Sequence, residues 1–102
     1  MNIPELRKIL KNENINPLAY SLSESEPVAL ENVYCLRVHP DNIEVYGTDR
    51  ADRLDVQHFD NESDACKSLL TMMSQYHDKR LAKYLSQYDD HKSDYRSTKG
   101  SD

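Results

Sequence analysis

The chain has 102 residues and a formal net charge of −5, and 30% of its residues are charged. This length accommodates one domain with a modest core and excludes a deep substrate cleft between two domains. No apolar run approaches the roughly 20 residues of a membrane-spanning helix, and the amphipathic first ten residues lack the apolar block of a secretory signal. We therefore expect a cytoplasmic protein that does not enter a membrane.

The N-terminal segment predicts a helix over residues 4–13. Pro4 suits the first helical turn, and Asn16-Pro17 interrupts the helix, since the residue before proline avoids helical geometry. The apolar residues at helical spacing are Ile3, Leu6, Ile9 and Leu10. Residues 17–22 are expected to turn and then extend, and residues 23–27 form a polar loop.

Three short strands are expected next, each with the alternation of side chains that a strand imposes. They cover residues 32–38, 43–47 and 53–59. In the second strand Ile43 and Val45 are expected to face the core. In the third strand we expect Leu54 and Val56 to point inward.

A second main helix is expected to begin after Asp60 or Asn61, either of which can cap it. Its predicted apolar face comprises Ala65, Cys66, Leu69, Leu70, Met73 and Tyr76. The helical pattern continues to Tyr88, either as one long helix or with a break near residues 77–78. We predict a single domain over residues 1–88 and a polar, flexible tail over residues 89–102.

These elements together predict an α+β fold. It consists of an N-terminal helix, a three- to four-stranded antiparallel β-meander, and a C-terminal helix or helix pair packed on one face.

The sequence contains no recognisable catalytic or cofactor-binding group. Its two glycines, Gly47 and Gly100, cannot form a phosphate-binding loop, and no serine lies in a glycine-flanked elbow. No histidine pair has the spacing of a helical metal site. Cys35 and Cys66 have no zinc ligands nearby and are expected to be reduced core residues. We therefore expect a protein that is not an enzyme and that uses no cofactor or metal; a small hydrolase is the least favoured alternative.

Negative charge is concentrated in the middle of the chain. Residues 24–64 contain eleven acidic residues and three arginines, a local net charge of −8. This charge disfavours direct nucleic-acid binding, which relies on neutralising phosphates, and favours a basic protein partner. The same composition is also compatible with a surface that only keeps the protein in solution.

The order of features over residues 3–72 indicates a family. An amphipathic helix is followed by NPLAYSL, YCL, EVY, an Asp49-Arg50 turn and finally ESDACKSLL. This order resembles the small bacterial immunity proteins of polymorphic toxin systems, including those of contact-dependent growth inhibition. The resemblance implies a protein that binds and neutralises a cognate toxin domain, often a nuclease, with a ribonuclease favoured. An acidic inhibitor would then cover the basic substrate-binding face of that nuclease.

The partner is expected to contact the second and third strands and the turn between them. Acidic side chains there would pair with lysines and arginines, and a tyrosine would form a central anchor, because tyrosine is enriched at interfaces. The predicted contact residues are Glu44, Tyr46, Asp49, Asp52 and Asp55.

Two alternatives accompany this prediction. The second choice of surface is the acidic loop that contains Glu24, Glu26 and Glu31. The alternative function is a generic acidic adaptor or regulatory module with no toxin partner. The sequence leaves the oligomeric state open, since a strand edge or a tyrosine-bearing helix could each support a dimer.

Overall fold

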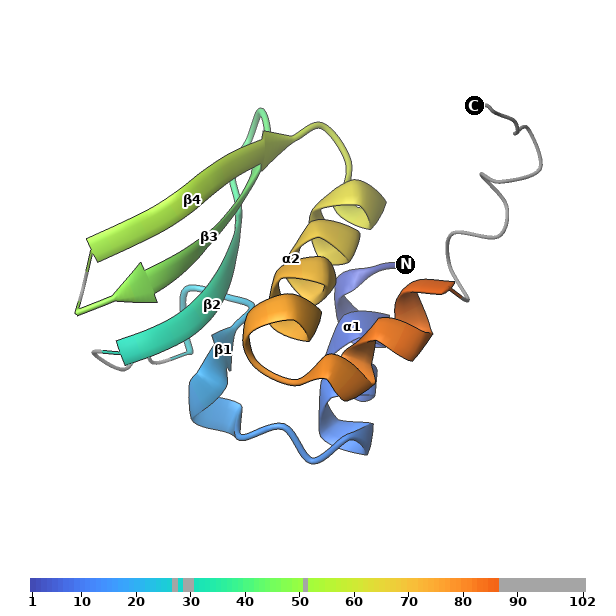
Figure 1. Cartoon of the computed structure of the whole chain (residues 1–102). Coiled ribbons are helices and arrows are strands. Elements are labelled where there is room, and N and C mark those ends of the chain that lie inside the picture. The colour runs from blue at the N-terminus through green and yellow to red at the C-terminus, as the bar shows by residue number, and fades with distance from the viewer. Residues whose placement is uncertain (27, 29–30, 51, 87–102) are drawn as a thin grey trace, which may run out of the picture.

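The computed structural model describes residues 1–26, 28, 31–50 and 52–86 (Figure 1). The elements in chain order are α1 (Ile3–Asn12), the 3₁₀ turn η1 (Pro17–Ala19), β1 (Tyr20–Ser21), β2 (Glu31–Val38), β3 (Ile43–Asp49), β4 (Asp52–Phe59), α2 (Glu62–Tyr76) and the 3₁₀ turn η2 (Lys79–Leu81). Residues 82–86 are helical. The predicted α+β fold is confirmed, and the predicted tail, residues 89–102, lies outside the described residues.

Helix α1 begins at a reciprocal pair of hydrogen bonds between Asn2 and Glu5. The Asn2 side chain accepts from the backbone N–H of Glu5, and the Glu5 carboxylate accepts from the backbone N–H of Asn2, each at 2.9 Å. These bonds satisfy amide groups that have no partner within the helix. Leu6, Ile9 and Leu10 are buried on one side of α1, as their spacing predicts.

The four strands form one sheet in the order β1-β2-β3-β4. Strands β2, β3 and β4 are antiparallel neighbours, which confirms the predicted meander for these three. The first strand departs from it, because β1 pairs in parallel with β2, Tyr20 lying opposite Tyr34.

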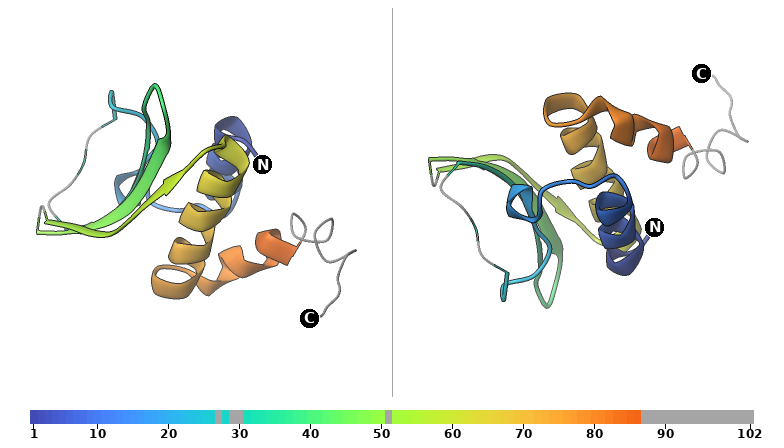
Figure 2. Two further views of the ribbon diagram at one scale, coloured as in Figure 1. Left: turned by 90° about the horizontal axis from the view of Figure 1, so that it is seen from above. Right: turned by 90° about the horizontal axis from the view of Figure 1, so that it is seen from below.

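Helix α2 covers one face of the sheet, and α1 packs beside α2 on the same side (Figures 1 and 2). Strands β2 and β3 alternate as predicted. Leu36, Ile43 and Val45 belong to the main core beneath α2, whereas Val33, Cys35 and Tyr46 form a separate buried cluster. The sheet is therefore packed on both faces along these two strands.

The side chain of Asn61 caps α2 by accepting a 2.8 Å hydrogen bond from the N–H of Asp64. The predicted apolar face of α2 is buried at five of its six positions, namely Ala65, Cys66, Leu69, Leu70 and Met73. Tyr76 was also expected in the core, but 71% of its surface is exposed. It is the last residue of α2, and His77 caps the helix there. Of the two expected alternatives, the structure therefore has the break near residues 77–78 and not one long helix.

Strand β4 does not bury the two residues that its alternation predicts. Leu54 is 47% exposed and Val56 is 41% exposed. Gly47 pairs with Leu54 and Val45 pairs with Gln57, so Asp55 and Val56 together lie opposite a single residue of β3. Asp55 has a left-handed φ of 54°. This β-bulge breaks the period of two, and the position of β4 at the edge of the sheet leaves both apolar side chains accessible.

The helical segment after α2 is attached to the end of α1 by polar contacts. The Tyr84 hydroxyl donates a 2.6 Å hydrogen bond to Glu13 Oε2 and accepts one of 3.1 Å from Asn12 Nδ2. The Lys83 ammonium lies 3.0 Å from Glu13 Oε2. These contacts hold residues 82–86 against the end of α1, which lies about 70 positions earlier in the sequence.

Candidate partner-binding surface

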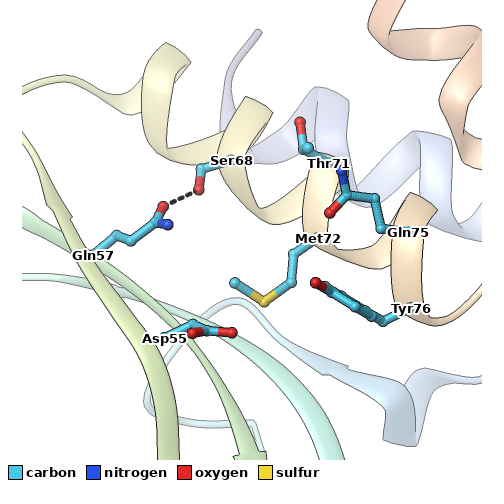
Figure 3. A pocket seen from close by; sticks show the side chains of 7 residues that line it. All are labelled: Asp55, Gln57, Ser68, Thr71, Met72, Gln75 and Tyr76. Atoms are coloured by element: carbon cyan, nitrogen blue, oxygen red, sulfur yellow. Dashed lines mark hydrogen bonds between the residues drawn. The ribbon is translucent and has the colours of Figure 1, made fainter.

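The five predicted contact residues do not form one surface. Glu44 and Tyr46 lie on the face of the sheet opposite α2, because they alternate with core residues of β3. Asp49 and Asp52 face each other where β3 turns into β4. Asp55 lies on the α2 side of β4 (Figure 3). The structure therefore divides the predicted site into three places.

Glu44 is buried and surrounded by one arginine and two histidines. Arg53 donates from its two terminal nitrogens to the two carboxylate oxygens, each at 3.1 Å. His39 Nε2 lies at 3.2 Å and His58 Nε2 at 3.6 Å. Burial opposes ionisation of this carboxyl, but the hydrogen bond from His39 and the charge of Arg53 outweigh it, so the Glu44 pKa is lowered. Its charge is thus compensated within the protein.

Tyr46 is only 7% exposed and packs with Val33 and Cys35. The guanidinium carbon of Arg53 lies 4.2 Å from the centre of the Tyr46 ring, a cation–π arrangement. A partner would reach the Tyr46 ring only after displacing Arg53. The residue expected as a central anchor is therefore covered in the free protein.

The end of the β3–β4 hairpin carries accessible acidic side chains. Asp49 and Asp52 are exposed and directly opposite each other, and Arg50, also exposed, occupies the turn with a φ of 53°. Among the described residues, neither carboxylate has a cation within 4 Å. Like charges directly opposite each other destabilise a sheet, so a cation brought by a partner would relieve this repulsion.

A groove runs between β4 and the C-terminal half of α2. It consists of two adjoining hollows of about 240 and 290 Å³ that share Asp55, Met72 and Tyr76. One hollow is also lined by Gln57, Ser68, Thr71 and Gln75, and the other by Asn32, Tyr34, Gly47, Thr48 and Leu54. Figure 3 shows the side chains of Met72 and Tyr76 projecting from α2 toward Asp55 on β4.

Two local features open this groove. Gly47 adds no side chain where β3 passes beneath α2, and a Cβ built there would lie 3.7 Å from the Met72 sulfur. The bulge at Asp55 then changes which side chains of β4 face the helix. Closer to the start of α2, Ser68 donates a 2.6 Å hydrogen bond to Gln57 and links helix and strand.

The outer edge of β4 is available for pairing. In the described sheet, β4 pairs only with β3, and its residues from Asp52 to His58 are all exposed. An exposed edge presents unpaired backbone N–H and C=O groups to which another polypeptide can add as a strand. The groove and this edge are continuous along β4 and together form the candidate partner-binding surface.

The second acidic surface that we considered is partly occupied. Glu26 accepts hydrogen bonds of 2.7 and 3.2 Å from Arg7 and one of 2.8 Å from the backbone N–H of Leu22. The hydrogen bond from Arg7 lowers the Glu26 pKa against the opposing effect of burial. Glu24 is exposed, and the side chain of Glu31 lies outside the described part.

Sequence reasoning missed most of the groove. Leu54 and Tyr76 were expected in the core, and Gly47 and Met72 received no role. The available signal was Gly47, a glycine inside a predicted strand, which often marks a place where side chains or backbones approach closely. The positive φ of Asp55 had no sequence signal beyond the tolerance of aspartate for that conformation.

Comparison of the chain with protein-family models, with curated proteins and with solved structures found no match. Within the described ranges, no helix is long and apolar enough to cross a membrane, and no three side chains are grouped so that they could hold a metal ion. The observed features define a small α+β protein with an open edge strand, an acidic hairpin end and an adjoining groove.

Proposed function

We propose that this chain is a non-enzymatic immunity protein that acts in the cytoplasm by binding and neutralising a cognate toxin domain. A nuclease is the favoured toxin, and a ribonuclease in particular. The observation that carries the proposal is strand β4, whose residues from Asp52 to His58 are all exposed, together with the acidic pair that Asp52 forms with Asp49 at the end of β3. The resemblance to bacterial immunity proteins supplies the identity of the partner.

The charge of the hairpin end supports a basic partner. Asp49, Asp52 and Asp55 are exposed along the hairpin, and Arg50 offsets one of these charges. A nuclease must present a basic face to its substrate. Opposite charges on the two proteins would speed their encounter, and an inhibitor seated on the basic face would exclude nucleic acid by charge and by volume.

The first experiment is co-expression with the toxin domain that the proposal expects to be encoded immediately upstream. We expect growth to be rescued and the two proteins to co-purify, whereas the toxin alone arrests growth. If an active toxin is neither neutralised nor bound, the immunity function is wrong. The generic acidic adaptor, which would use the same exposed edge for another partner, would then be the better interpretation.

The second experiment reverses the hairpin charge with Asp49→Lys and Asp52→Lys together. The two lysines of the variant would lie opposite each other as the two aspartates do. The repulsion between like charges therefore destabilises the variant and the original protein to a similar extent. We expect association with the toxin to slow by about tenfold at low salt, with little change in dissociation. The control reverses two exposed acids outside both candidate surfaces, Asp41→Lys with Asp60→Lys. Equal association rates for both double variants would contradict a role for the hairpin end.

A further inference from the structure

We infer that the groove between β4 and α2 receives a basic side chain, lysine or arginine, from a partner segment that lies along the free edge of β4. The inference rests on the proposed function to the extent that a protein partner binds this surface. It does not depend on that partner being a toxin. It deepens the proposal by specifying which chemical group is recognised and which residues recognise it.

Charge is the first argument for a basic occupant. Asp55 is the one charged residue among the described side chains that line the two hollows. Its carboxylate points from β4 toward Met72 and Tyr76 (Figure 3), and no described cation lies within 4 Å of it. An apolar occupant would remove this carboxylate from water without replacing its hydrogen bonds, which is costly. An acidic occupant would be repelled.

The walls of the groove are the second argument. Tyr34, Tyr76 and Met72 line the hollow that also contains Asp55, and Tyr76 is 71% exposed, an unusual state for a large side chain next to a core. Aromatic rings and a thioether suit the alkyl stem of lysine or arginine, and a cation can also lie over a tyrosine ring. The groove thus offers an apolar wall for the stem and a carboxylate for the head.

The edge of β4 provides the route by which such a side chain would arrive. A strand added to β4 would alternate its side chains between the two faces of the sheet. Those on the α2 side would lie beside Leu54 and Asp55, at the mouth of the groove. A second copy of β4 fits less well, because it would bring Asp52 and Asp55 of two acidic strands together, while Arg53 is engaged with Glu44.

The inference can be tested without a toxin. A phage-displayed library of random dodecapeptides is selected against the intact chain, and the enriched peptide is synthesised for anisotropy measurements. We expect a lysine or arginine flanked by strand-forming residues. Replacing that residue by norleucine or citrulline should weaken binding by about tenfold, the usual effect of losing a hydrogen bond to a charged group.

Asp55→Asn is the matched change in the protein. Asparagine tolerates a positive φ as well as aspartate does, so the bulge is retained. We expect this variant to bind the basic peptide about tenfold less tightly and the neutral peptide equally well, so that the two changes are not additive. Asp60→Asn removes the same charge from an exposed position at the end of β4 and should leave binding unchanged.

Three results of the peptide measurements would overturn the inference: no enrichment of basic peptides, equal binding by the Asp55→Asn variant, or additive effects of the two changes. A stable dimer in sedimentation velocity whose β4 amides are protected from hydrogen exchange would assign the edge to a second copy and also overturn it. Toxin neutralisation without any preference for basic peptides would support the proposed function and contradict only the inference about the groove. Binding of basic peptides without toxin neutralisation would support the inference about the groove and contradict the immunity function.

Discussion

Arg53 of β4 forms two hydrogen bonds of 3.1 Å with Glu44 of β3, across the face of the sheet opposite α2. The same guanidinium lies over the ring of Tyr46. One arginine therefore compensates the charge of one predicted contact residue and covers another. The accessible acidic groups are instead at the hairpin end and on the α2 side of β4.

The first prediction concerns Glu44→Gln, which removes the carboxylate but retains its shape. We expect the free energy of unfolding in urea to fall by about 1 kcal/mol, since Glu44 is buried but Arg53 is half exposed and partly screened by solvent. Glu24→Gln, at an exposed position, is the control and should change stability by less than about 0.5 kcal/mol. Equal effects of the two substitutions would show that the Glu44 cluster adds no stability.

The second prediction concerns pH and the contact between Glu13 and Tyr84. The hydrogen bond from Tyr84 and the contact with Lys83 lower the Glu13 pKa. A carboxyl with a lowered pKa in the folded state stabilises the fold above its unfolded pKa, and this contribution is lost as pH falls through the folded pKa. The attachment of residues 82–86 to α1 should therefore weaken on acidification below about pH 4.

This prediction is measured by following the Glu13 carboxyl carbon in an NMR titration. Tyr84→Phe should raise the Glu13 pKa toward its ordinary value. Tyr76→Phe removes the same hydroxyl from an exposed tyrosine on α2 and should leave the Glu13 titration where it was. A titration of Glu13 that does not respond to Tyr84→Phe would show that the hydroxyl is not the main cause.

The third prediction concerns the reactivity of the two cysteines. Cys35 and Cys66 are free and fully buried, which confirms the expectation that both lie in the core. Burial raises the pKa of Cys35, and it raises that of Cys66 to about 12. At pH 8 the Cys66 thiol is therefore almost entirely protonated, and the reactive thiolate is scarce. Iodoacetamide should therefore label the native protein slowly, at a rate that follows unfolding. Rapid labelling of either cysteine, measured by mass spectrometry, would contradict this packing.

The fourth prediction concerns Gly47→Ala. The new methyl group would lie 3.7 Å from the Met72 sulfur and 4.0 Å from Tyr34 Cδ1, which are ordinary contact distances. Replacing a glycine inside a strand also reduces the entropy lost on folding. We expect the free energy of unfolding in urea to be unchanged or to rise by up to about 1 kcal/mol. A clear loss of stability would mean that β3 and α2 cannot accommodate even one methyl group.

The sequence predicted the parts of the fold that depend on local patterns. The apolar stripe of α1 and the alternation of β2 and β3 were recognised correctly, and Asn61, the cap of α2, was one of the two candidates. Each of these depends on residues within one or two turns or on adjacent positions along a strand. The break after α2 was among the expected alternatives. The direction of β1 was not predicted, because pairing with a neighbour depends on how the connecting chain returns.

The candidate site depended on contacts between elements. Composition indicated an acidic surface, but it could not show that Arg53, His39 and His58 enclose Glu44. The bulge at Asp55 changed the expected orientation of the side chains that follow Leu54 in β4, because one extra residue in a strand changes which face each later residue occupies.

The sequence by itself determined the local elements, the overall charge and the acidic character of residues 24–64. Only the tertiary structure decided which acids are free, that β4 is an exposed edge, and that Gly47, Asp55 and Tyr76 surround one groove. The physical reason is the range of the interactions involved. Helix caps and alternation act over a few neighbouring residues, whereas burial, charge pairing and cavities depend on residues that folding brings together from distant parts of the chain.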